Sequence, residues 1–205
     1  MSELNRALAE IDVIRGQLAR VTQFRGYGPA SIAASGLLAL GVAVLQARWL
    51  RGALQDLGAF LAVWTATAAV SVILAGIETI RRARRVHSGL AWQMIQSALE
   101  QFLPALVVGL LLTVVLIRVA PRDCWMLPGL WAIIFSLGIF ASCRFLPRRM
   151  FAVGVWYLAA GLASLAIEGP QRTLSPWAMG IPFGFGQLAV AAVLQFGLEE
   201  PIEEG

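Results

Sequence analysis

Six long windows of the sequence carry no charged residue, and they constrain the fold more than any other feature. A membrane-spanning helix needs about 20 predominantly apolar residues, with a range of about 17–25. Five of the windows meet this requirement directly, and the third lies at its short limit. The windows cover residues 26–47, 57–77, 101–117, 124–143, 150–167 and 173–198. We therefore predict an all-α, polytopic membrane protein, a bundle of six transmembrane helices.

The composition excludes the two competing classes, a soluble domain and a membrane barrel. Charged residues make up 14% of the chain and hydrophobic residues 59%, whereas a soluble domain carries about 25% charged residues. A soluble fold of this size could not bury so much apolar surface. Barrel strands alternate apolar and polar residues, but residues 110–117 are apolar almost throughout. With the barrel excluded, helices are the remaining structure that satisfies every backbone hydrogen-bonding group in lipid.

The chain divides into three predicted parts. An amphipathic cytoplasmic helix at 1–25 is followed by a transmembrane domain at 26–198 and an acidic cytoplasmic tail at 199–205. The predicted spans are 29–47, 57–77, 101–119, 124–144, 150–167 and 177–198. The limits of the third span stay open, because the amphipathic run before it or Arg118 after it would lengthen it. Charged residues interrupt the first 25 positions, so we expect no signal peptide and a retained first span.

The arginines predict the orientation. All sixteen basic residues are arginine, and placing the N-terminus inside puts eleven of them on the cytoplasmic side and five on the other. This is the positive-inside bias expected of short loops. We therefore expect cytoplasmic termini, cytoplasmic loops at 78–88 and 144–149, and a location in the bacterial inner membrane. The arginine cluster at 81–85 lacks interleaved aromatic residues, so lipid headgroups rather than nucleic acid are its expected contact.

The sequence offers no candidate catalytic, cofactor-binding or metal site. His87 is the sole histidine, so one chain cannot build a site from several histidines. Cys124 and Cys143 lie 19 residues apart on one predicted helix, or about 28 Å, too far for a disulfide with each other. No nucleophile has an evident base, and no phosphate-binding or dinucleotide motif is present. We expect a protein that is not an enzyme.

Two carboxylates flank the predicted second and third spans. Glu78 ends the second span and Glu100 precedes the third, both at the predicted inner boundary. Ionisable residues within membrane segments often mark ion or proton pathways, but neither of these lies near a midplane. Pairing with nearby arginines at the interface is one interpretation. The alternative is a cytoplasmic vestibule formed by the two carboxylates.

The sixth window contains a motif for close helix packing. Gly180 and Gly184 form a GxxxG pair, with Pro182 between them. Glycines at this spacing let two helices approach closely, and the proline frees a backbone carbonyl and tends to kink the helix. The motif predicts helix packing, and a break that lines a substrate path is the alternative.

The N-terminal arm carries a heptad pattern. Its apolar stripe needs a surface to bury it, and the membrane headgroups, the protein's own bundle and another chain compete for that role. Acidic and basic residues balance on its polar face, which favours protein contact over lipid. The arm therefore predicts a homo-oligomer or a protein partner. Its candidate association residues are Leu4, Ile11, Ile14, Leu18 and Val21.

These observations leave two function classes. The first is a non-enzymatic scaffold or accessory subunit that associates with other membrane or cytoplasmic proteins. The second is a transporter or channel component for a small or apolar solute. Membrane lipid is a partner in both classes, and neither needs a cofactor or nucleic acid.

Overall fold

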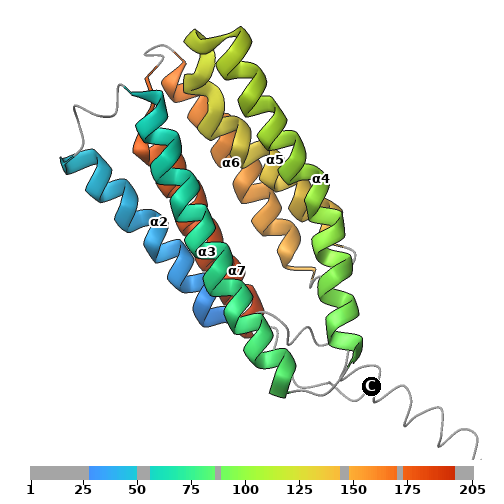
Figure 1. Ribbon diagram of the computed structural model, residues 1–205. Coiled ribbons are helices and arrows are strands. Elements are labelled where there is room, and N and C mark those ends of the chain that lie inside the picture. The colour runs from blue at the N-terminus through green and yellow to red at the C-terminus, as the bar shows by residue number, and fades with distance from the viewer. Residues whose placement is uncertain (1–27, 50–55, 86–88, 144–147, 170–172, 197–205) are drawn as a thin grey trace, which may run out of the picture.

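The computed structural model describes residues 28–49, 56–85, 89–143, 148–169 and 173–196 (Figure 1). These residues form helices only, and successive helices alternate in direction along the bundle. The elements are α2 (Pro29–Trp49), α3 (Leu57–Arg85), α4 (Gly89–Val119), the 3-10 helix η2 (Pro121–Met126), α5 (Leu127–Ser142), α6 (Met150–Glu168) and α7 (Pro176–Phe196). The all-α class and the helical membrane bundle are confirmed. The predicted helix at 1–25 and the tail at 199–205 lie outside the described residues.

The length and apolar composition of its helices identify this chain as an integral membrane protein. Five helical segments are long and apolar enough to cross a membrane by length and composition. The apolar part of α4, Leu103–Val119, is shorter, as the third window indicates. The five longer segments are Pro29–Arg48, Leu57–Glu78, Pro121–Ser142, Met150–Glu168 and Pro176–Phe196.

Local sequence explains where the helices begin. The Asp56 carboxylate accepts a hydrogen bond from the Gly58 N–H at 2.9 Å, which caps the start of α3. The Ser175 hydroxyl accepts one from the Trp177 N–H at 3.3 Å at the start of α7. Pro176 is the first residue of α7, where a missing N–H costs nothing.

The arginine cluster at 81–85 belongs to a helix, so the loop predicted at 78–88 is wrong for residues 78–85. Helix α3 continues to Arg85, because arginine and alanine are good helix formers and cations suit a helix C-terminus. Helix α4 begins at Gly89, twelve residues before the predicted third span. Both helices are therefore longer than the membrane alone requires.

The predicted fourth span at 124–144 divides into two elements. Residues Pro121–Met126 form a 3-10 helix, and the α-helix begins only at Leu127. Prolines explain the division, since Pro121 and Pro128 each occupy a position near the start of a helical segment, where proline is favoured.

The helices gather into two groups of three (Figure 1). In the first group, α2 packs along α7 in the most extensive interface of the bundle, and α3 packs on α2. In the second group, α5 packs along α6, and α4 packs on α5. A smaller interface, mainly between α6 and α7, joins the two groups. We call this interface the seam.

Indole N–H groups tie helices together across three of these interfaces. Each donates to an oxygen on a neighbouring helix, which satisfies a polar group that lipid could not. The bonds run from Trp64 to the Gln46 amide at 3.0 Å, from Trp131 to the Thr113 hydroxyl at 2.8 Å, and from Trp156 to the Pro182 carbonyl at 3.1 Å. The third bond crosses the seam.

Candidate functional site

Glycines close the contact between α7 and α2. A Cβ at Gly36 of α2 would lie 2.7 Å from the Gly184 carbonyl oxygen on α7. Gly180 faces Ala43, and Gly184 also faces Leu40. Small residues permit this approach, and van der Waals packing is a main source of helix association in lipid. The GxxxG pair thus lies in the α2–α7 contact.

Pro182 lies on the other side of α7, at the seam. It is fully buried, and it does not interrupt α7, which runs as one helix from Pro176 to Phe196. Its carbonyl oxygen accepts the Trp156 hydrogen bond from α6. The substrate-path interpretation of Pro182 stays a prediction.

Three aromatic rings from three helices meet in the seam. Phe135 of α5 lies 4.7 Å from Tyr157 of α6, measured between ring centroids. Phe183 of α7 lies 5.4 Å from each of them in edge-to-face geometry. Such arrangements contribute about 0.5–1.5 kcal/mol per pair beyond area burial. All three residues lie in the middle third of their helices, so the triangle sits near the centre of the bundle.

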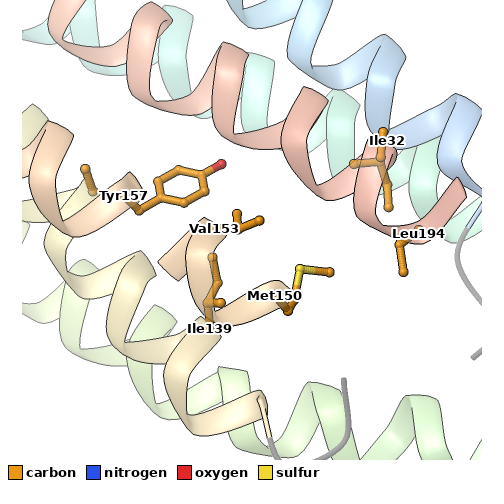
Figure 2. Packing of buried hydrophobic residues seen from close by; sticks show 8 residues of the cluster. Ile32, Ile139, Met150, Val153, Tyr157 and Leu194 are labelled. Atoms are coloured by element: carbon orange, nitrogen blue, oxygen red, sulfur yellow. The ribbon is translucent and has the colours of Figure 1, made fainter. Parts of the chain in front are cut away.

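The Tyr157 hydroxyl is the polar group at the centre of this triangle. The side chain has no exposed surface, and Figure 2 shows it projecting from α6 with its hydroxyl directed toward α7. The hydroxyl abuts Gly186, where the missing Cβ leaves room for it. The Gln187 side chain is its hydrogen-bonding neighbour across the seam.

Trp125 carries a buried indole N–H without a partner among the described residues. Trp125 belongs to η2, which precedes α5, and the edge of its ring lies beside Gly169. Tryptophan is common near the ends of membrane spans.

The two candidate vestibule carboxylates have different surroundings. The Glu78 carboxylate lies against Gly28 at the N-terminus of α2, where the helix dipole favours a negative charge. Glu100 is exposed on α4. Their helices, α3 and α4, share no extensive interface among the described residues. The vestibule stays a prediction.

The remaining sequence candidates form no chemical site in the described part of the chain. Cys124 and Cys143 are both free thiols. Among the described residues, no three side chains of the metal-binding types gather closely enough to hold an ion. His87 and the association residues of the N-terminal arm, namely Leu4, Ile11, Ile14, Leu18 and Val21, lie outside the described residues.

Sequence reasoning did not single out Tyr157 and Gln187. A search of membrane spans for ionisable side chains passes over a tyrosine and an amide. The available signal was weak: Tyr157 is one of two tyrosines in the chain, and both residues lie in largely apolar windows that also hold other polar residues. Only the packing of α6 on α7 brings them together.

Comparison with models of known protein families, with curated proteins and with solved structures finds no match for this chain.

Proposed function

We propose that this protein is a non-enzymatic scaffold or accessory subunit that associates with other proteins in or at the membrane. The observation that carries the proposal is the surface of α3. Of its apolar segment only 17% is buried within the bundle, against 39% for α2 and 44% for α7. The main neighbour of α3 among the described helices is α2, and the rest of its surface meets either lipid or another protein.

Residue size distinguishes the first part of the free face of α3 from the free face of α4. Near its start, α3 exposes Ala62, Thr65, Ala66 and Ala69, which share one helix face. Farther along, α3 also exposes bulky side chains, such as Val72 and Ile73. Helix α4 exposes bulky side chains throughout its apolar part, namely Leu103, Leu106, Val107, Leu110, Leu111 and Val114. Bulky aliphatic residues suit contact with acyl chains, whereas small residues are enriched where membrane helices pack. The α3 face therefore favours a protein neighbour.

The N-terminal arm is the second proposed association element. Its heptad residues would add a cytoplasmic contact to the contact through α3. Replacing Ile11 and Ile14 with aspartate should shift the solubilised protein to a smaller assembly or release a partner. Unchanged assembly size in that variant would remove the arm from the proposal.

A paired substitution tests the α3 surface. Ala66→Leu with Ala69→Leu should reduce the mass of the assembly in mild detergent, because larger side chains hold a neighbouring helix away. Val107→Leu with Val114→Leu on α4 is the matched control and should leave the mass unchanged. Light scattering coupled to size exclusion gives the mass, and a thermal melt shows that the fold is intact. Equal masses for both variants, or a wild-type monomer that brings down no partner from native membranes, would overturn the proposal.

We further propose that the protein lies in the bacterial inner membrane with both termini in the cytoplasm. The arginine asymmetry of the sequence supports this orientation. A reporter that is active only in the periplasm, fused after Gly205, should stay inactive. An active fusion would reverse the orientation.

A transporter or channel component for a small or apolar solute is the second candidate function. One observation favours it, namely the buried Tyr157 hydroxyl beside the Gln187 side chain in the seam between the two helix groups. Solute sites of membrane transporters commonly lie near the midplane between two such halves.

A further inference from the structure

We propose that the acidic tail at 199–205 docks on the arginine cluster at the end of α3. The cluster consists of Arg81, Arg82, Arg84 and Arg85. The tail is thus a built-in occupant of a helix end of opposite charge. This contact goes beyond the proposed association, which concerns the membrane-embedded face of α3, and does not depend on it.

The charges of the two segments match and are not balanced by neighbours in the sequence. No acidic residue occurs between Glu78 and Glu100, and the Glu78 carboxylate lies against Gly28 of another helix. In the C-terminal part of the chain, no basic residue follows Arg172. The four glutamates of the tail are Glu199, Glu200, Glu203 and Glu204. Four positive charges on α3 therefore have four negative charges as their counterpart.

The fold brings both segments to the same end of the bundle. Helices α3 and α7 both pack on α2 and run in the opposite direction to it (Figure 1). At the start of α2, Gly28 contacts Glu78, and Ile32 belongs to the same buried cluster as Leu194. Helix α7 ends two residues after Leu194, whereas α3 continues for seven residues past Glu78, to Arg85. The arginine cluster therefore projects beyond the level at which the described part of α7 ends.

The tail is long enough to reach the cluster. Packed helices lie about 8–10 Å apart, so α3 and α7, which share the neighbour α2, are at most about 20 Å apart at this end. An extended chain covers about 3.3 Å per residue. The residues from Phe196 to Glu204 can therefore span roughly 25 Å, and the side chains of both segments add to that reach.

The depth of the cluster favours the tail over lipid headgroups as its main contact. The apolar segment of α3 ends at Glu78, and the headgroup layer beyond the hydrocarbon is about 5–7 Å thick. Along the helix axis, Arg81 lies about 4.5 Å past Glu78, and Arg85 lies about 10 Å past it. The first arginine is thus at headgroup depth, whereas the last one stands in water, where the tail can meet it.

Covalent attachment makes weak pairing sufficient. A single exposed ion pair contributes at most about 1 kcal/mol, but a segment of the same chain has an effective concentration in the millimolar range. Docking should therefore occur at low salt and weaken as salt screens the charges. While the tail is docked, an anionic lipid or an acidic protein must displace it before binding the same arginines.

Zero-length cross-linking of the full-length protein in phosphatidylcholine nanodiscs tests the contact. A carbodiimide joins an amine to a carboxylate only where the two touch, and this chain has no lysine. Arg85→Lys therefore adds one side-chain amine and keeps the charge. It should form an amide bond with a tail glutamate, identified by peptide mass mapping, and Arg84→Lys is the second variant. Arg48→Lys, at the opposite end of the bundle, is the control and should form no bond with the tail.

Salt and lipid composition sharpen the test. At about 1 M salt, where the Debye length is about 3 Å, the yield should fall several-fold. An unchanged yield, or no bond to the tail from either α3 variant, would overturn the inference. Loss of the bond when phosphatidylglycerol is added would assign the cluster to lipid, and a cross-linked dimer would assign the tail to a second copy. Either result would also overturn the inference.

Another exposed arginine at this end of the bundle provides a competing position for the tail. Arg148 lies just before α6, and Arg148→Lys should cross-link to the tail less than Arg85→Lys does. The reverse order would move the tail from α3 to α6 and overturn the inference. Failure of the α3 variants to cross-link would leave the assembly mass unchanged, so the association proposal is tested separately.

Discussion

Helix α7 meets its two neighbours through different kinds of contact. Toward α2 it presents glycines, and the atoms opposed across that contact include main-chain atoms, as at Gly36 and Gly184. Toward α6 it presents an aromatic side chain, a proline carbonyl and a glycine that faces the Tyr157 ring. Main-chain contacts cannot adjust by changing rotamers, whereas side-chain contacts can. We therefore expect substitutions on the α2 side to be tolerated less well than those on the α6 side.

The largest expected effect is on the contact between α7 and α2. Gly36→Leu would drive a side chain against the α7 main chain and should cost at least about 3 kcal/mol, beyond ordinary overpacking. Gly41 lies five residues further along the same helix, and a Cβ there meets nothing within 4 Å. Gly41→Leu is therefore the control and should leave the Tm unchanged. If both variants yield equal amounts of monodisperse protein, the glycine contact does not hold the helices together.

An intermediate effect compares the two sides directly. A Cβ at Gly186 would overlap the Tyr157 ring, so Gly186→Ala should cost about 1–3 kcal/mol. Adding Tyr157→Leu removes the ring and should recover part of that loss, giving a double-mutant coupling of about 0.5–3 kcal/mol.

The matching pair on the α2 side is Gly36→Ala with Leu188→Ala. Leu188 also lies near Gly36, but its truncation leaves the main-chain contact with Gly184 in place. This pair should therefore show little recovery of the Tm. Similar recovery in both pairs would mean that the two sides of α7 do not differ in the way described.

The smallest effect concerns the hydrogen bond that crosses the seam. Trp156→Phe removes the donor to the Pro182 carbonyl and should lower stability by about 0.6–1.7 kcal/mol, from the average to the maximum measured for hydrogen bonds between membrane helices. Trp177→Phe is the control, because that indole is 42% exposed. A loss much larger than this range would mark the seam as a rigid contact and weaken the comparison with α2.

The sequence predicts the helices far better than it predicts their partners. Charge-free windows identify spans because burying a charge in lipid is costly. They do not identify faces, because a lipid-embedded helix is apolar all round and lacks the stripe that marks a soluble helix. Gly180 and Gly184 indicate a close contact, yet nothing in the sequence assigns that contact to α2. The arginines at 81–85 predict a loop by their charge, whereas their helix propensity decides the structure.

The sequence likewise does not show which residues of the candidate site become neighbours. Glu78 and Glu100 are visible in the sequence because they are charged, but their helices share no extensive interface in the described part of the chain. Tyr157 and Gln187 are separated by 30 positions and contribute no motif. They become neighbours only when steric fit sets α6 against α7, and steric fit depends on three-dimensional packing that no local pattern encodes.

The pairing of α2 with α7 also sets the order of events during synthesis. Helix α2 ends at Trp49, whereas its partner is complete only at Phe196. At about 5–20 residues per second, the ribosome needs on the order of ten seconds to deliver the second helix after the first. Throughout that interval the surface of α2 around Gly36, which later contacts α7, lies in the bilayer without its partner. A chaperone, the translocon or a helix of another nascent chain has that long to occupy it.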